Sequence, residues 1–146
     1  MNNEYDVFIS YATKDRERVS ELKTKLEGAG IKTWTDQEII PGQSWAEEIR
    51  KAIETSRYAL ILVSESSLKS EGANFETGVA LSRVRGGKEI QILPVVDPGI
   101  ELSRLPFGLK DYQSVNAQDV DKLVSQLQTF FSQDKEKPVS KVKSEI

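Results

Sequence analysis

The chain has 146 residues, of which 38% are hydrophobic and 29% charged, so it can form one hydrophobic core and is too apolar to be disordered. Its net charge of −3, with acidic and basic residues interspersed, argues against nucleic acid as a partner. It contains no cysteine and no histidine, which excludes disulfides, Ser-His-Asp triads and the common zinc sites. We therefore expect no metal, and any chemistry has to use carboxylates, hydroxyls or amines.

The chain begins with a strand pattern followed by a helix pattern. Residues Tyr5–Ser10 have an apolar centre, which predicts a strand buried on both faces. Helical spacing then places apolar residues at Val19, Leu22, Leu26 and Ala29. This spacing predicts a helix that follows Asp15 and ends at Gly28 and Gly30.

A second strand and a distinctive loop come next. Residues Ile31–Thr35 alternate as in a strand, and Asp36–Ser44 form a polar loop with a turn dipeptide at its centre. The centre of the loop consists of Ile39, Ile40, Pro41 and Gly42. Ser44 is the predicted N-cap of an amphipathic helix whose apolar positions are Trp45, Ile49, Ala52 and Ile53.

The second half of the chain repeats the alternation. The apolar run Ala59–Val63 predicts a central strand, and the serine-rich segment Ser64–Ser70 predicts a loop. Phe75 and Val79 indicate a short helix. The remaining predicted elements are a strand at Ile90–Val96, a connection at Asp97–Asp111, a short strand around Tyr112–Val115 and a final helix from Val120 to Phe131.

This order predicts an α/β fold: a flavodoxin-like three-layer sandwich in which helices cover both faces of a five-stranded parallel sheet. Ligands are expected at the carboxyl ends of the strands, near the topological switch point. We assign residues 1–132 to the domain and 133–146 to a polar, disordered tail or linker. The sequence shows neither a signal peptide nor an apolar run of membrane-spanning length, so we expect a cytoplasmic protein with no membrane partner.

Three segments together resemble the Toll/interleukin-1 receptor (TIR) family, in its bacterial form. They are Tyr5–Tyr11 with Asp15, Trp34–Asp36 continuing through Pro41–Trp45, and Ser64–Ser70 continuing through Phe75 and Glu76. Each motif alone is weak, but their order and spacing fit the family over residues 4–131. The resemblance implies a role in bacterial immunity or virulence.

The resemblance also implies an activity and a self-association surface. NAD-cleaving members of the family place a glutamate in the helix after the third strand, and Glu76 matches that position. The loop at Asp36–Ser44 matches the family's BB loop, a mobile lid through which domains associate. The family pattern has a tryptophan four residues before the glutamate, where this chain has Gly72. A side chain that stacks on the substrate at that point is therefore missing or is supplied from elsewhere.

One glutamate is chemically sufficient for this reaction. Glycosides usually need an acid to protonate the leaving group, but the nicotinamide of NAD⁺ is a cationic pyridinium and leaves as a neutral molecule. A carboxylate fixed beside the ribose stabilises the developing positive charge, and one such group is worth about 3 kcal/mol. We assign this catalytic role to Glu76. Gly72 and Ala73, one turn earlier on the same side of the helix, leave space for the ribose.

The other candidate substrate-binding residues have alternative interpretations. Phe8, Ser10 and Tyr11 end the first strand and are placed to line the cleft, although Phe8 is equally explained as core. Asp36 matches an acidic position near the ribose, or is simply a turn residue. For Trp45 we favour the core over stacking on nicotinamide, because its spacing matches the buried face of its helix.

Glu76 and Phe75 also have an ordinary structural interpretation. Glu76 is then a solvated surface glutamate, as most glutamates are, and Phe75 is a core residue that shares a helix face with Val79. We favour core for Phe75 and catalysis for Glu76, because only Glu76 matches the functional position of the family.

The sequence thus leaves two functions in competition. The first is an NAD⁺ nucleosidase that releases nicotinamide and forms ADP-ribose or a cyclic ADP-ribose, with NAD⁺ as substrate and no cofactor. The second is a non-catalytic signalling module that pairs with identical domains through the loop. The two are compatible, because the resemblance implies that assembly completes the active site. A dinucleotide oxidoreductase is excluded, since no G-x-G-x-x-G motif follows a strand.

Overall fold

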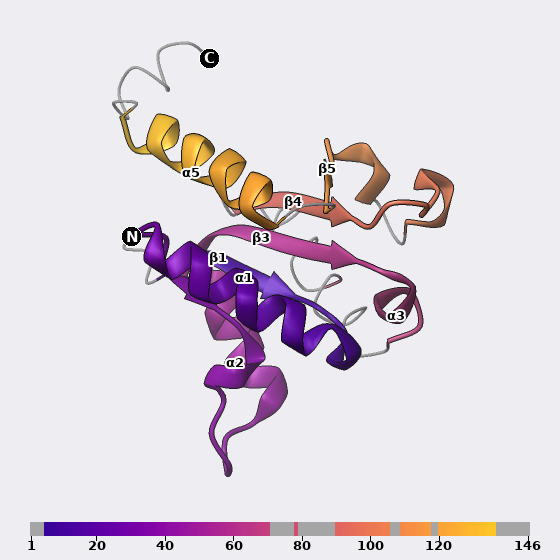
Figure 1. Ribbon diagram of the computed structural model, residues 1–146. Helices are drawn as coiled ribbons and strands as arrows, with labels where there is room; N and C mark the ends of the chain where they lie inside the picture. Colours follow the sequence, from indigo (N-terminus) through magenta and orange to yellow (C-terminus); the bar gives the residue numbers. More distant parts are fainter. Residues whose placement is uncertain (1–4, 71–77, 79–89, 106–108, 118–119, 137–146) are drawn as a thin grey trace.

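The computed structural model describes residues 5–70, 78, 90–105, 109–117 and 120–136. In these ranges, five strands form one parallel sheet in the order β2-β1-β3-β4-β5 (Figure 1). The strands are β1 (Tyr5–Ser10), β2 (Thr33–Trp34), β3 (Ser56–Val63), β4 (Gln91–Val96) and β5 (Val115–Asn116). The helices are α1 (Arg16–Gly28), α2 (Trp45–Glu54), α3 (Glu65–Leu68) and α5 (Val120–Glu136). The predicted flavodoxin-like α/β fold is confirmed.

Both faces of the sheet carry a hydrophobic core, and β3 contributes to both. Leu60 and Leu62 of β3 pack in a core with α1 and α5, whereas Ile61 and Val63 pack in a second core with α2. The alternation follows from strand geometry, because successive side chains point to opposite faces. A strand buried on both faces has to be apolar along its whole length, as the run Ala59–Val63 is.

The edge strand β2 is shorter than the sequence predicts. Only Thr33 and Trp34 pair with β1, whereas the alternation extends over Ile31–Thr35. Backbone hydrogen bonds explain the difference, because the N–H of Ile31 donates to Leu26 in the last turn of α1. At the other end, the Thr35 side chain accepts from the N–H of Gln37 and begins a short 3-10 helix, Asp36–Glu38.

The serine-rich segment after β3 is a helix and not the predicted loop. Ser64 is the N-cap of α3, and its Oγ accepts from the N–H of Ser67 at 3.0 Å. The Oγ of Ser67 in turn accepts from the N–H of Ser64 at 2.8 Å, which completes a capping box. Serine occupies the position where glutamate or glutamine is usual, so the sequence signal for this cap is weak.

The last two elements also differ in their bounds from the sequence prediction. Pairing with β4 begins at Val115, so β5 starts at the predicted strand's last residue. Helix α5 continues to Glu136, past its predicted end at Phe131. The predicted short helix around Phe75 and Val79 and most of the predicted tail, 137–146, lie outside the described residues. Among the helices that the structure describes, none is long and apolar enough to span a bilayer.

Candidate active site at the carboxyl ends of the strands

The strand order creates a switch point between β1 and β3. From β1 the chain turns to α1 on one face of the sheet, and from β2 it crosses through α2 on the other face to β3. The segments that leave the carboxyl ends of β1 and β3 therefore lie beside one another, which is where open α/β sheets bind ligands. The polar side chains at this edge are the candidates for a site.

Phe8 belongs to the core. Its side chain is 0% exposed and stacks on Trp34, with ring centroids 5.2 Å apart and an interplanar angle of 11°. Ser10, at the end of β1, is also fully buried. Of the two interpretations of Phe8, the structure supports packing between β1 and β2. Its ring helps to fix the end of β1 and does not line an open cleft.

Tyr11 and Asp36, both predicted to bind substrate, are joined to one another. The hydroxyl of Tyr11 donates to Oδ1 of Asp36 at 2.6 Å, a distance typical of a charge-assisted hydrogen bond. The Nε2 of Gln37 donates both to the Tyr11 hydroxyl and to Oγ of Ser20, each at 3.2 Å. Burial and the hydrogen bond to Asp36 raise the pKa of Tyr11 to about 12, so the hydroxyl keeps its proton near neutral pH.

A second polar cluster lies where β1 and β3 end, and sequence reasoning did not assign it a function. Asp15, the last residue of a 3-10 helix (Thr13–Asp15), is buried, and its Oδ2 accepts from Oγ of Ser64 at 2.5 Å. Ser64 is also buried and caps α3. Asp15 thus connects the segment after β1 to the segment after β3. A carboxylate after one strand and a serine after its neighbour were the available sequence signal.

An arginine extends this cluster to β4. Arg18 forms a bidentate ion pair with Asp97, directly after β4, with N–O distances of 2.6 and 2.9 Å. The hydrogen bond to Asp97 raises the pKa of Arg18 above its ordinary value. A second bidentate pair joins Arg104 to Glu65 at the start of α3, at 2.6 and 2.9 Å. Side chains from α1, α3 and the segment after β4 are therefore linked around this edge of the sheet.

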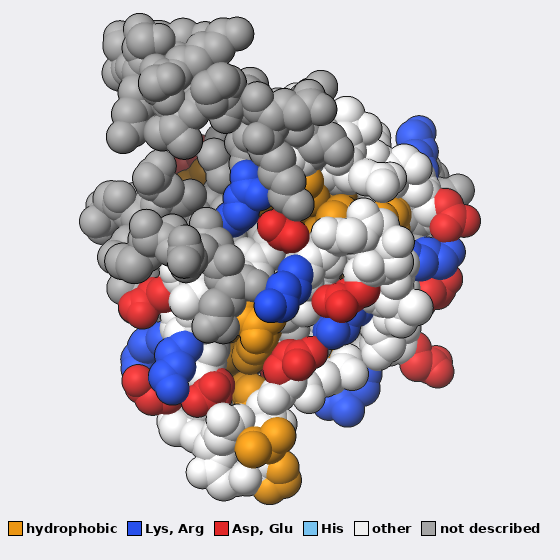
Figure 2. All heavy atoms as spheres, turned by 90° about the vertical axis from the view of Figure 1, so that its left-hand side faces the viewer, with side chains coloured by type: hydrophobic (Ala, Val, Ile, Leu, Met, Phe, Trp, Pro, Cys, Tyr) orange, Lys and Arg blue, Asp and Glu red, His pale blue; other side chains and the backbone are white. Residues whose placement is uncertain are grey.

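The loop between β2 and α2 projects away from the sheet (Figure 1). Ile40 is 61% exposed, Ile39 is half-buried, and Pro41 and Gly42 are exposed. Gly42 has a φ of 95°, a conformation that favours glycine, which is consistent with the predicted turn. Figure 2 shows hydrophobic side chains at this lowest projection of the molecule, whereas charges of both signs are interspersed higher on the same face. Of the predicted self-association residues, Ile40, Pro41 and Gly42 thus lie at an exposed tip, whereas Ile39 packs against the core on the α2 side of the sheet.

The preference for a core position of Trp45 is wrong. Its side chain is 41% exposed, although it is spaced four residues from the fully buried Ile49. Trp45 is the first residue of α2, where the helix leaves the projecting loop, so the first turn extends past the core that covers Ile49. Helical periodicity gives the direction of a side chain but not how far the neighbouring layer extends.

Glu76, Gly72 and Phe75 lie outside the described residues, so their predicted roles stay predictions. Where the structure does describe the chain, no three side chains of the metal-binding types come together as ligands.

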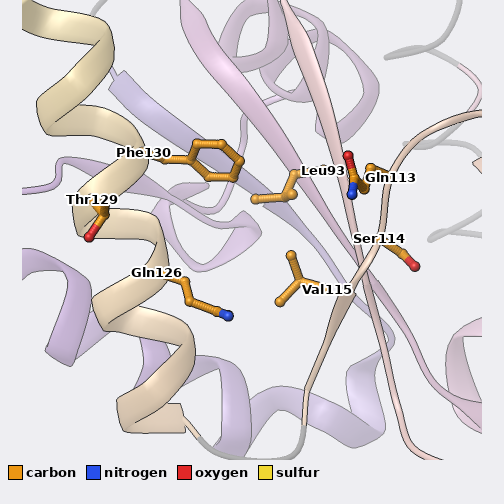
Figure 3. A pocket seen from close by; sticks show the side chains of 7 residues that line it. All are labelled: Leu93, Gln113, Ser114, Val115, Gln126, Thr129 and Phe130. Atoms are coloured by element: carbon orange, nitrogen blue, oxygen red, sulfur yellow. The ribbon is translucent and has the colours of Figure 1, made fainter.

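A hollow of about 440 Å³ lies elsewhere, between β4, the start of β5 and α5 (Figure 3). Its walls include Leu93, Val115 and Phe130, and the polar residues on it are uncharged. It is not at the carboxyl edge of the sheet, so it is a poor candidate for the expected NAD⁺ cleft.

Comparisons with known proteins agree with the fold. A family model described as the TIR domain matches residues 7–129. The chain is 31% identical over 94 residues to the 2' cyclic ADP-D-ribose synthase AbTIR of Acinetobacter baumannii. It is 33% identical over 94 residues to the NAD(+) hydrolase TcpA of a Theionarchaea archaeon. Each match covers 63% of this chain but only 35% and 28% of the relative, so the chain spans about a third of their length.

A solved TIR-domain structure also has a fold similar to that of this chain. The TIR domain of the Toll-related receptor TRR-2 from Hydra magnipapillata superposes with a TM-score of 0.71 at 30% sequence identity. The match covers 90% of this chain and 99% of that one. Because the family model covers most of the chain and the relatives include a bacterial protein, the chain belongs to the TIR-domain family, in its bacterial form.

Proposed function

We propose that this TIR domain is an NAD⁺ nucleosidase that cleaves the bond between nicotinamide and ribose. The products are nicotinamide and either ADP-ribose or a cyclic ADP-ribose. The observation that carries the proposal is family membership together with two relatives, above 30% identity, named as an NAD(+) hydrolase and a cyclic ADP-ribose synthase. NAD⁺ is the substrate, and the proposal requires no separate cofactor or metal.

Glu76 is the proposed catalytic residue. Its position matches the catalytic glutamate of the family, and a chain without histidine or cysteine has carboxylates as its natural catalytic groups. The departing pyridinium needs no proton, so a single carboxylate facing the ribosyl cation is chemically sufficient. We place the substrate at the carboxyl ends of β1 and β3, where the strand order changes direction.

We further propose that the domain is activated by self-association. An apolar side chain as exposed as Ile40, at the tip of a projecting loop, is suited to insertion into a neighbouring copy. Acidic and basic side chains are interspersed on the face that Figure 2 shows, which argues against nucleic acid as a partner. A cytoplasmic location and a role in bacterial immunity or virulence belong to the same proposal.

The test is nicotinamide release from NAD⁺, followed by chromatography over a range of protein concentrations. The wild type should release nicotinamide, and the specific rate should rise with concentration because assembly completes the site. Glu76→Ala should lower the rate at least a hundredfold, the range seen when one preorganised catalytic group is removed. Glu76→Gln, which keeps the size but removes the charge, should be nearly as inactive.

The matched control is Glu101→Ala, which removes an exposed glutamate just after β4 and should retain wild-type activity. Circular dichroism and size-exclusion profiles establish that all variants fold. If Glu76→Ala keeps the rate of Glu101→Ala, Glu76 is not catalytic. The product peak separates hydrolysis from cyclisation.

The alternative function is a non-catalytic module that acts by pairing with other TIR domains. The exposure of Ile40 and of Trp45 favours it, because both are large apolar side chains on adjoining segments. A wild type that assembles at high concentration yet releases no nicotinamide above the Glu76→Ala background would support the module and reject the enzyme.

A further inference from the structure

The loop between β2 and α2 has two parts with different attachments. Its base, the 3-10 helix Asp36–Glu38, contacts the end of β1 and helix α1 through side chains. Its tip, residues 39–43, is closed by two hydrogen bonds of its own. The N–H of Ile40 donates to Oε1 of Gln43 at 2.9 Å, and the N–H of Gln43 donates to the Ile40 carbonyl at 3.2 Å. The position of the tip therefore depends on the contacts of the base and on Ile39, which is half-buried and packs against the core on the α2 side of the sheet.

The side chains of Lys23, Ser20 and Tyr11 contact the base, and these contacts differ in rigidity. Lys23 forms an ion pair with Glu38 at 3.1 Å, and Gln37 donates to Ser20 at 3.2 Å, but Glu38 and Gln37 are exposed and both contacts use long side chains. Contacts of this kind contribute little, because solvent competes with them and ordering the side chains costs entropy. They are weak determinants of where the loop lies.

The third contact is short and fixed at one end by the core. Tyr11 is only 6% exposed, and its ring packs in the core formed by the sheet with α1 and α5. Its hydroxyl donates to Asp36 at 2.6 Å and accepts from Gln37 at 3.2 Å, so one rigid group contacts two successive residues of the base. A hydrogen bond to a carboxylate at this distance is stronger than one between neutral groups.

We propose that Tyr11 is a positioning residue that fixes the base of the loop through Asp36, and that the loop tip is thereby held in the orientation that a second copy of this chain contacts. Asp36 then acts as the acceptor for Tyr11 and not as a contact to the ribose. The expected effect on nicotinamide release rests on the proposed function, whereas the expected effect on the order of the loop does not.

The first experiment measures hydrogen exchange of individual loop amides in Tyr11→Phe, which removes only the hydroxyl. The amides of Glu38 and Ile39 donate to Thr35 and Asp36 within the base, so they report directly on its order. Their exchange should accelerate about fivefold, as expected for the loss of one hydrogen bond. The N–H of Gly30, in the turn after α1, should exchange at the wild-type rate and serves as an internal reference.

Variants of Asp36 test whether its hydrogen bond with Tyr11 is what slows exchange of the loop amides. Asp36→Asn keeps an oxygen that accepts from Tyr11 and should retain most of the loop protection, whereas Asp36→Ala should match Tyr11→Phe. The double variant Tyr11→Phe/Asp36→Ala should exchange no faster than either single variant, because both remove the same contact. The matched control is Tyr112→Phe, the same substitution on a half-buried tyrosine at the other side of the sheet.

The second experiment follows nicotinamide release against protein concentration. For Tyr11→Phe, half-maximal specific activity should need a several-fold higher protein concentration, while KM for NAD⁺ under full assembly stays unchanged. If Asp36 instead contacts the ribose, Asp36→Ala raises KM and leaves loop exchange as in the wild type, and the positioning role is wrong. Equal exchange at Glu38 and Ile39 in wild type and Tyr11→Phe also overturns it. A wild type that is inactive rejects the proposed function but leaves the exchange result to decide the role of Tyr11.

Discussion

Two serines begin two helices in this chain, and their surroundings differ. Ser44 caps α2 at the end of the projecting loop, is exposed, and accepts one hydrogen bond from the N–H of Glu47 at 3.4 Å. Ser64 caps α3 at the end of β3, is buried, and forms a reciprocal capping box with Ser67. In addition, Ser64 donates to the buried carboxylate of Asp15.

The comparison shows that the same local feature, an N-cap serine, contributes differently to stability in exposed and buried surroundings. An exposed cap stabilises its own helix, and water replaces the hydrogen bond when the cap is lost. A buried cap that also donates to a carboxylate connects two strand ends. When it is lost, solvent water does not replace its hydrogen bonds. The segment after β1 also contacts the residues before each helix: Tyr11 donates to Asp36 in the loop before α2, and Asp15 accepts from Ser64, the N-cap of α3.

The largest effect is expected at Ser64. Ser64→Ala should lower the free energy of unfolding by about 2 to 3 kcal/mol, because it removes a helix cap and the short hydrogen bond to Oδ2 of the buried Asp15, whose other donor, Arg18, lies 3.5 Å from Oδ1. Urea denaturation followed by circular dichroism measures the change. Ser66→Ala, on the same helix but outside the capping box, should change stability far less.

A double-mutant cycle with Asp15→Ala identifies the origin of that loss. The two substitutions should combine less than additively, by about 1 kcal/mol, because both remove the bond between Oγ of Ser64 and Oδ2 of Asp15. Full additivity would show that the two residues act independently and that burial of the cap alone explains the effect.

The contribution of Tyr11 to the free energy of unfolding should depend on pH in the alkaline range. Its pKa is raised to about 12 from 10.0 by burial and by Asp36, so the folded state holds the phenol proton more tightly than the unfolded state. This contribution to stability is fully present below pH 10 and is lost as the pH rises from 10 towards 12. Between these values, the wild type should lose stability more steeply than Tyr11→Phe. Parallel unfolding curves for the two proteins across that range would contradict the assignment.

A smaller effect is expected at Ser44. Ser44→Ala should lower the free energy of unfolding by about 0.5 to 1 kcal/mol, the usual cost of losing an exposed cap. Ser44→Asp, which preserves the acceptor, should retain wild-type stability in the same urea titration. If Ser44→Ala destabilises the domain as much as Ser64→Ala, the contrast between exposed and buried caps does not hold.

The smallest effect is expected at the ion pair between Arg104 and Glu65. Glu65→Gln should leave the urea midpoint unchanged within error, although the pair is bidentate, because exposed ion pairs gain little over their interactions with water. The measurement is repeated at high and low salt, where a pair that mattered would show a larger loss at low salt. A clear loss would mean that this pair helps to hold α3 in place.

Much of the fold was predictable because its signals are local. The apolar run of β3 and the spacing in α1 and α2 indicate burial without reference to other parts of the chain. Ser44 was correctly predicted as the N-cap of α2. By contrast, α3 was missed, because its cap uses two serines in place of the usual serine and glutamate and the helix is only one turn long.

The candidate site was predictable in part. Tyr11 and Asp36 were predicted to bind substrate, and that role stays a prediction. Their direct hydrogen bond was not predicted, because it joins positions 25 apart in sequence. Trp45 was misplaced because periodicity does not report where the covering layer ends. The roles of Glu76 and Gly72 stay predictions, since both residues lie outside the described ranges.

The sequence by itself determined the class of fold, the order of its strands and helices along the chain, and the family resemblance that identifies Glu76. These depend on composition, periodicity and motifs, which are properties of short segments. Only the tertiary structure decided that Asp15 meets Ser64, that Arg18 meets Asp97 and that Tyr11 holds Asp36. Parallel crossovers bring the carboxyl ends of strands distant in the chain to one edge, and no local pattern records which polar groups then become partners.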